Sequence, residues 1–149
     1  MDLSDASFLT DTIVREGTYD DAKESSIVII TAGAKQRDGE TREMLMDRNV
    51  SILKSIAGQM LPVSDETLVL LVANPVDILT QIFQEISGIP RSRVIGSGTY
   101  LDSMRLRTAL SKKFHVAPSH VHAYVVGMHG DLQVPVWSSA QVGGVPIHE

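Results

Sequence analysis

Residues 26–31 read SIVIIT, an uninterrupted run of apolar and β-branched residues that is broken by Ala32-Gly33. A second run, TLVLLVA, occupies residues 67–73 and ends at Asn74-Pro75, and a shorter third run, residues 93–95, stops at Gly96-Ser97-Gly98. Continuous apolar runs bounded by turn residues are typical of strands in a parallel sheet that is covered on both faces. The three runs therefore predict three such strands.

Two helical stretches separate these runs. Residues 40–61 carry apolar residues at helical spacing, and residues 76–86 predict a second helix that is stopped by Gly88-Ile89-Pro90. Alternation of strand and helix is the pattern of βαβ crossover units. We therefore expect the α/β fold class, with part of a doubly wound, Rossmann-type parallel sheet.

The pattern changes after Gly98, where we place a domain boundary, so that residues 1–98 and 99–149 belong to different units. Residues 99–114 predict a long helix with Thr99 as N-cap, and residues 121–126 and 134–138 predict strands. Residues 2–10 resemble the tail of a helix, and the sequence stops just after the turn at 143–146. We expect a central piece of a longer protein, with both ends missing.

Composition excludes several classes of function. The chain has 149 residues, a net charge of −5 and no cysteine. These values argue against disulfides, thiolate metal sites and a nucleic-acid-binding surface. Neither a run of ~20 apolar residues, as a membrane span needs, nor a signal peptide is present. We expect a cytoplasmic protein that binds no nucleic acid, membrane or metal.

The ends of the predicted strands are candidate ligand sites, because open α/β sheets bind ligands beyond their carboxyl ends. Thr31-Ala32-Gly33-Ala34, Asn74-Pro75 and Gly96-Ser97-Gly98 lie there, although each is also explained as a tight turn. A Gly-x-Gly-x-x-Gly fingerprint is absent from this sequence. The polar loop KQRDGETR, residues 35–42, is either a solvated connector or a mobile lid that carries Gln36 and Arg42 onto a substrate.

Three further residues could carry chemistry. Asp102 and Arg105 share a face of the predicted helix, where a surface ion pair is the simpler interpretation. His129 lies between Gly127 and Gly130 just past a predicted strand, a setting suited to proton transfer. The other histidines have no comparable setting, and we expect them at the surface: His115, His120, His122 and His148.

Six motifs, in order, resemble the lactate/malate dehydrogenase family over nearly the whole chain, and most closely its lactate-specific branch. They are TAGA (31–34), GETR (39–42), NPVD (74–77), GSGT (96–99), LDSMR (101–105) and GMHGD (127–131) followed by VPVW (134–137). The resemblance implies hydride transfer between NAD(H) and a small 2-hydroxy/2-keto acid in a homo-oligomer, a dimer or tetramer. Residues 1–98 would then be the C-terminal part of an NAD-binding domain, and residues 99–149 the start of an α+β substrate domain.

The resemblance also implies roles for individual residues. His129 would exchange the proton with the substrate oxygen, Asp102 would orient its ring, and Arg42 would polarise the ketone. Arg105 would hold the substrate carboxylate through a two-pronged hydrogen bond. Asn74 would lie near the substrate oxygen and the nicotinamide ribose. The cofactor would also be contacted by three residues beyond the first predicted strand: Thr31, Ala32 and Gly33.

Gln36 occupies the position at which this family distinguishes substrates. A neutral Gln there implies L-lactate/pyruvate, because a second carboxylate would be buried without a partner. Arg37 is the next residue, and a shift of one position in the loop would bring it into the pocket and favour malate/oxaloacetate instead. A truncated, non-catalytic fragment is the other alternative. Against it stands the joint retention of His129, Asp102, Arg105 and Arg42.

Overall fold

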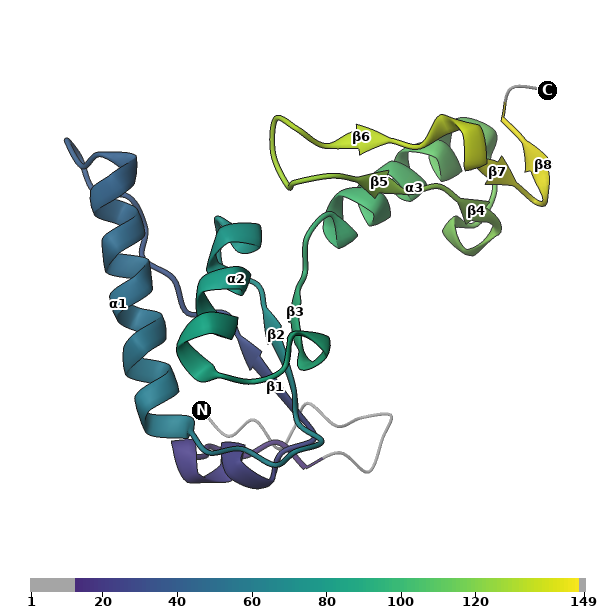
Figure 1. Cartoon of the computed structure of the whole chain (residues 1–149). Coiled ribbons are helices and arrows are strands. Elements are labelled where there is room, and N and C mark those ends of the chain that lie inside the picture. Colours follow the sequence, from purple (N-terminus) through teal and green to yellow (C-terminus); the bar gives the residue numbers. More distant parts are fainter. Residues whose placement is uncertain (1–12, 148–149) are drawn as a thin grey trace.

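The computed structural model describes residues 13–147, which form two units joined near residue 98 (Figure 1). The first unit contains strands β1–β3 with helices α1 and α2, and the second contains α3 with strands β4–β8. The expected helix tail at residues 2–10, like His148, lies outside the described residues. None of the helices in residues 13–147 is long and apolar enough to cross a membrane.

A parallel sheet forms the centre of the first unit, as the three apolar runs predict. Strands β1 (Ile27–Ile30), β2 (Leu68–Leu71) and β3 (Val94–Gly96) lie in the order β1-β2-β3. Ile30 pairs with Leu71, and Leu71 pairs with Gly96, so the carboxyl ends of all three strands share one edge. The expected α/β fold class is confirmed.

Helices α1 (Arg42–Met60) and α2 (Val76–Ser87) connect these strands. The Thr41 hydroxyl accepts the Met44 N–H and so begins α1, whereas α2 ends at Gly88, whose φ of +67° favours glycine. The helices pack on the sheet through a core that includes Leu53, Leu79 and Phe83. Burial of each such side chain contributes roughly 1.5–3 kcal/mol.

Only one face of the sheet is covered within the described residues. Ile30, Val69, Leu71 and Val94 are buried against α1 and α2, whereas their neighbours Ile27, Ile29 and Ile95 are about half exposed. Successive side chains of a strand point to opposite faces, so the exposed residues form a second apolar face. The expectation of cover on both faces is thus not met in residues 13–147, because α1 and α2 share one core.

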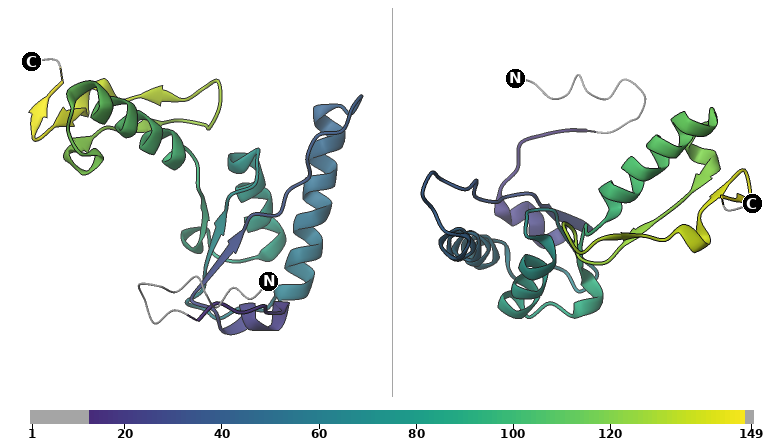
Figure 2. Two further views of the ribbon diagram at one scale, coloured as in Figure 1. Left: turned by 180° about the vertical axis from the view of Figure 1, so that it is seen from behind. Right: turned by 90° about the horizontal axis from the view of Figure 1, so that it is seen from above.

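The second unit is built on helix α3 (Tyr100–Phe114) and short antiparallel strands. The single strand expected at residues 121–126 is wrong: β4 (Val121–His122) pairs with β7 (Gln141–Val142), whereas β5 (Val125–Val126) pairs with β6 (Val134–Pro135). The expected strand at 134–138 ends early, because Trp137–Ser139 forms a 3-10 turn. Strand β8 (Val145–Pro146) completes this unit, and Figure 2 shows both units from behind and above.

Candidate active site

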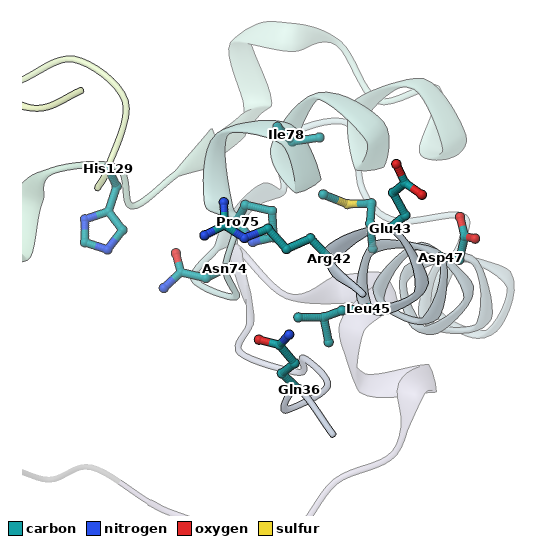
Figure 3. Close-up of a pocket in the computed structure, with 10 residues that line it drawn as sticks. Gln36, Arg42, Glu43, Leu45, Asp47, Asn74, Pro75, Ile78 and His129 are labelled. Carbon is teal, nitrogen blue, oxygen red and sulfur yellow. The ribbon is translucent and has the colours of Figure 1, made fainter. Parts of the chain in front are cut away.

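A cavity of about 700 Å³ opens beside the carboxyl edge of the parallel sheet (Figure 3). Its walls combine an apolar part with polar groups that come from both units. Four of the residues predicted from the sequence line it together: Gln36, Arg42, Asn74 and His129. The other lining residues are Glu43, Leu45, Met46, Asp47, Pro75 and Ile78.

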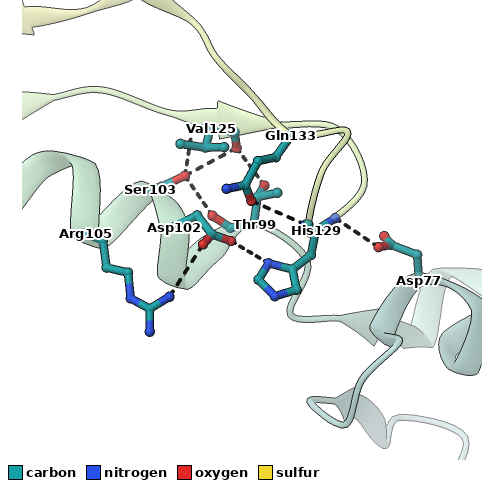
Figure 4. A network of polar contacts seen from close by, with 9 residues as sticks. Asp77, Thr99, Asp102, Ser103, Arg105, Val125, His129 and Gln133 are labelled. Atoms are coloured by element: carbon teal, nitrogen blue, oxygen red, sulfur yellow. Dashed lines mark hydrogen bonds and ion pairs between the residues drawn. The ribbon is translucent and has the colours of Figure 1, made fainter. Parts of the chain in front are cut away.

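His129 is brought to this cavity by the turn that follows β5. Gly127 has a φ of +95°, and a Cβ at this position would lie 2.6 Å from the Leu132 carbonyl oxygen, so the turn requires glycine. His129 Nδ1 lies 2.7 Å from Asp102 Oδ2 (Figure 4). The Asp102 carboxylate is 9% exposed and the imidazole 31% exposed. The carboxylate therefore orients the ring, and Nε2 is the nitrogen left for a ligand.

Hydroxyl groups fasten α3 to β5 and so hold Asp102 near His129. The Thr99 hydroxyl donates to the Val125 carbonyl over 2.6 Å. The Ser103 hydroxyl accepts the Val125 N–H over 2.9 Å. Thr99 is the N-cap residue, as predicted, but its side chain makes no capping bond because the hydroxyl serves Val125. Nothing in the sequence pattern indicated these bonds.

Arg105 lies beside the same carboxylate but outside the cavity wall. Its Nη1 is 3.7 Å from Asp102 Oδ1, and the side chain is 67% exposed (Figure 4). The i,i+3 relationship expected from the sequence is present, and the guanidinium remains accessible to a ligand. Asp102 is therefore flanked by His129 on one oxygen and Arg105 on the other.

Asp77 is a site residue that sequence reasoning missed. Its Oδ2 accepts the backbone N–H of His129 over 3.2 Å, which links α2 to the loop after β5 (Figure 4). Its place in the NPVD motif, two residues after the cis Asn74–Pro75 peptide bond, was the available signal. The two units thus meet at the histidine.

Gln36 and Arg42 reach the cavity from the β1–α1 connection. Arg42 is the first residue of α1, and its guanidinium points toward Asn74 and His129 (Figure 3). The Gln36 amide donates to the Glu40 carbonyl over 2.9 Å. Arg37 lines a separate hollow together with Glu40 and Arg48.

Thr31, Ala32 and Gly33 are exposed beyond β1 and do not line the cavity. A Cβ at Gly33 would lie 3.0 Å from the Ala73 Cβ, so the backbone is close-packed there. The buried Asn49 side chain accepts the Ala34 N–H over 2.7 Å and leaves its own Nδ2 without a partner. An exposed edge of small residues beside a cavity fits the approach of an extended cofactor.

Within residues 13–147, no cluster of three or more acidic or histidine side chains could hold a metal ion.

Comparisons with known proteins match both parts of the chain to one family. The sequence model described as "lactate/malate dehydrogenase, NAD binding domain" matches residues 1–96, and that described as "lactate/malate dehydrogenase, alpha/beta C-terminal domain" matches residues 99–149. L-lactate dehydrogenase A of Rhizopus oryzae is 50% identical over 99% of this chain and 46% of its own length.

Solved structures extend this similarity to the fold. The ligand-bound minor L-lactate dehydrogenase of Enterococcus mundtii has a TM-score of 0.89 and 39% identity, covering 99% of this chain and 48% of that one. The apo malate dehydrogenase of Picrophilus torridus has a TM-score of 0.81 and 37% identity, covering 87% of this chain and 40% of that one. The chain thus spans less than half the length of each of these relatives.

Proposed function

This chain belongs to the lactate/malate dehydrogenase family, and from that membership we propose that the whole protein interconverts L-lactate and pyruvate with NAD(H). The observation that carries the proposal is the pair formed by His129 and Asp102, 2.7 Å apart, on a cavity that Arg42 also lines. The pair supplies an oriented acid, and Arg42 supplies an electrophile. Reduction of a ketone requires both.

The proton is handled by His129. Because Nδ1 contacts Asp102, Nε2 donates its proton to the ketone oxygen during reduction and takes it back during oxidation. The Asp102 carboxylate fixes the orientation of the ring for this proton transfer. Asp102 and His129 therefore act together as the acid–base pair.

The substrate is held and polarised by cationic and amide groups. Arg42 and Asn74 face the ketone oxygen and stabilise the negative charge that develops on it. Arg105 is outside the cavity wall but exposed beside Asp102, and it binds the substrate carboxylate, because a planar guanidinium matches the two oxygens of that group. The apolar part of the wall, which includes Leu45 and Ile78, excludes water from the reaction.

Residues at the sheet edge would hold the NAD cofactor in this proposal. Thr31, Ala32 and Gly33, which are exposed beyond β1, would hold it, and Asn74 would lie near its nicotinamide ribose. When bound, NADH supplies the hydride for the ketone carbon. The surface of small residues at this edge supports the assignment.

Pyruvate is preferred to oxaloacetate because Gln36, and not Arg37, lines the cavity. A second carboxylate would enter this cavity without a cationic partner at Gln36, which costs several kcal/mol. Malate dehydrogenase activity is the alternative, and it would require Arg37 to leave the hollow that it lines with Arg48. The arrangement of these side chains favours lactate.

The test measures NADH absorbance of the whole protein with pyruvate and with oxaloacetate. We expect faster turnover of pyruvate, and we expect Gln36→Arg to reverse the preference. Absence of NADH consumption with both substrates would refute the proposal. Preference of the parent for oxaloacetate would replace it with malate dehydrogenase activity.

Three further features are part of the proposal. Residues 1–98 belong to the NAD-binding domain and residues 99–149 to the substrate domain, which the change of architecture after β3 supports. The whole protein is a homo-oligomer, a dimer or a tetramer, as its family resemblance implies, and it acts in the cytoplasm. Sedimentation of the purified whole protein tests the oligomeric state.

A further inference from the structure

The loop that carries Gln36 is closed by a tight turn at residues 37–40. The Glu40 N–H donates to the Arg37 carbonyl over 3.1 Å, and the Arg37 N–H donates to Glu40 Oε2 over 2.9 Å. Gly39 has a φ of +75°, which this turn needs and glycine adopts without strain. Arg37 and Glu40 therefore bind each other through two reciprocal hydrogen bonds.

Helix α1 anchors this turn through Arg48. Arg48 Nη1 donates to Glu40 Oε1 over 2.7 Å and to Oε2 over 2.9 Å. The Glu40 side chain is only 6% exposed, so its charge is balanced mainly by Arg48. The Arg48 guanidinium and the Arg37 N–H together hold the pKa of the Glu40 carboxyl below its usual range.

The turn at residues 37–40 directs the side chains of Gln36 and Arg37 to different hollows. Gln36 lines the active-site cavity and donates to the Glu40 carbonyl over 2.9 Å, whereas Arg37 lines the hollow on the Arg48 side. Glu40 thus bonds Gln36 through its main chain and Arg37 through its carboxylate. A shift of the loop by one position would break all of these bonds.

We propose that Glu40 is a specificity-determining positioning residue: anchored by Arg48, it fixes the loop register that presents Gln36 to the substrate and keeps Arg37 out of the cavity. This inference rests on the proposed function, because it concerns the choice between a monocarboxylate and a dicarboxylate keto acid. It assigns substrate choice to a carboxylate that does not line the cavity.

The test compares Glu40→Gln with the parent in the whole protein, using kcat/KM for oxaloacetate divided by kcat/KM for pyruvate. We expect this ratio to rise about tenfold, within the range that one pocket group provides. Released from Glu40, Arg37 enters the cavity and pairs with the second carboxylate. Arg48→Gln keeps Glu40 but removes its anchor, so it should shift the ratio in the same direction and can replace Glu40→Gln if that variant does not fold.

Two controls distinguish a change in loop register from the mere loss of a negative charge. Asp38→Asn removes one negative charge from the same turn and should leave the ratio unchanged. Arg37→Gln added to Glu40→Gln should abolish the gain. An unchanged ratio in folded Glu40→Gln, an equal gain in Asp38→Asn, or a gain that survives Arg37→Gln would each overturn the inference. A parent inactive with both keto acids would instead refute the proposed function.

Discussion

Asp77 Oδ2 accepts the backbone N–H of His129 over 3.2 Å, although one residue belongs to helix α2 and the other to the loop beyond β5. The imidazole of the same histidine contacts Asp102 on α3. The backbone of His129 is therefore held by the first unit and its ring by the second. Its position depends on both units at once.

Asp77→Ala should lower kcat with pyruvate by up to about tenfold, because small misplacement of a catalytic group is costly. Asp77→Asn retains an acceptor oxygen and should keep most of the activity. Steady-state kinetics, together with NADH affinity as a check on cofactor binding, make the comparison. Equal activity of the alanine variant and the parent would remove Asp77 from the site.

His129→Asn should abolish turnover while the protein stays folded. General acid–base catalysis contributes about 10²–10⁴-fold, and asparagine cannot replace the imidazole in that role. Circular dichroism and melting temperature report the fold, and NADH oxidation reports turnover. A loss of less than about fivefold lies far below this range and would exclude His129 as the acid.

The stabilising effect of Glu40 should depend on pH in a defined direction. Its pKa is lowered in the folded protein, mainly by the Arg48 guanidinium, so its contribution is complete above the ordinary glutamate value of about 4.3. The contribution is lost as pH falls through the lowered pKa. The melting temperature of Glu40→Gln should therefore lie below that of the parent at neutral pH, with the gap closing in acid. A gap that widened in acid would contradict this assignment.

Two adjacent isoleucines of β1 differ in burial, so their alanine variants should differ in unfolding free energy. Ile30 is 4% exposed and Ile29 58% exposed. Ile30→Ala should cost about 2–5 kcal/mol of unfolding free energy, as large-to-small core changes do. Ile29→Ala should cost less than about 1 kcal/mol in this chain. Urea unfolding of the two variants measures both values, and similar costs would mean that both faces of the strand are covered.

Much of the fold follows from local pattern. The apolar runs predicted β1, β2 and β3, because each is short, continuous and ended by Gly or Pro. Residues 121–126 were predicted as one strand, since apolar continuity does not reveal that Val121 pairs with β7 and Val125 with β6. The spacing of apolar residues within a strand does not identify the distant strand with which it pairs.

Only part of the candidate site could be predicted from the sequence, because contacts between distant residues leave no local pattern. Arg42, Asn74 and His129 stand in the quoted motifs and Gln36 in the loop just before one of them, and all four line one cavity. Asp77, Glu40 and Ser103 also stand in the quoted motifs, but they bond backbone N–H groups of other residues, and these contacts are seen only in the folded structure. The roles assigned to the predicted residues stay predictions until the variants are measured.

The division of the cavity between two stretches of chain has an evolutionary consequence. Gln36 and Arg42 precede β2, whereas Asp102 and His129 follow β3. On the proposed function, mutation or recombination in the earlier stretch would alter which keto acid is accepted while the proposed acid–base pair remains intact. Descendants with new substrates can then arise by divergence of a short loop, without reinvention of the chemistry.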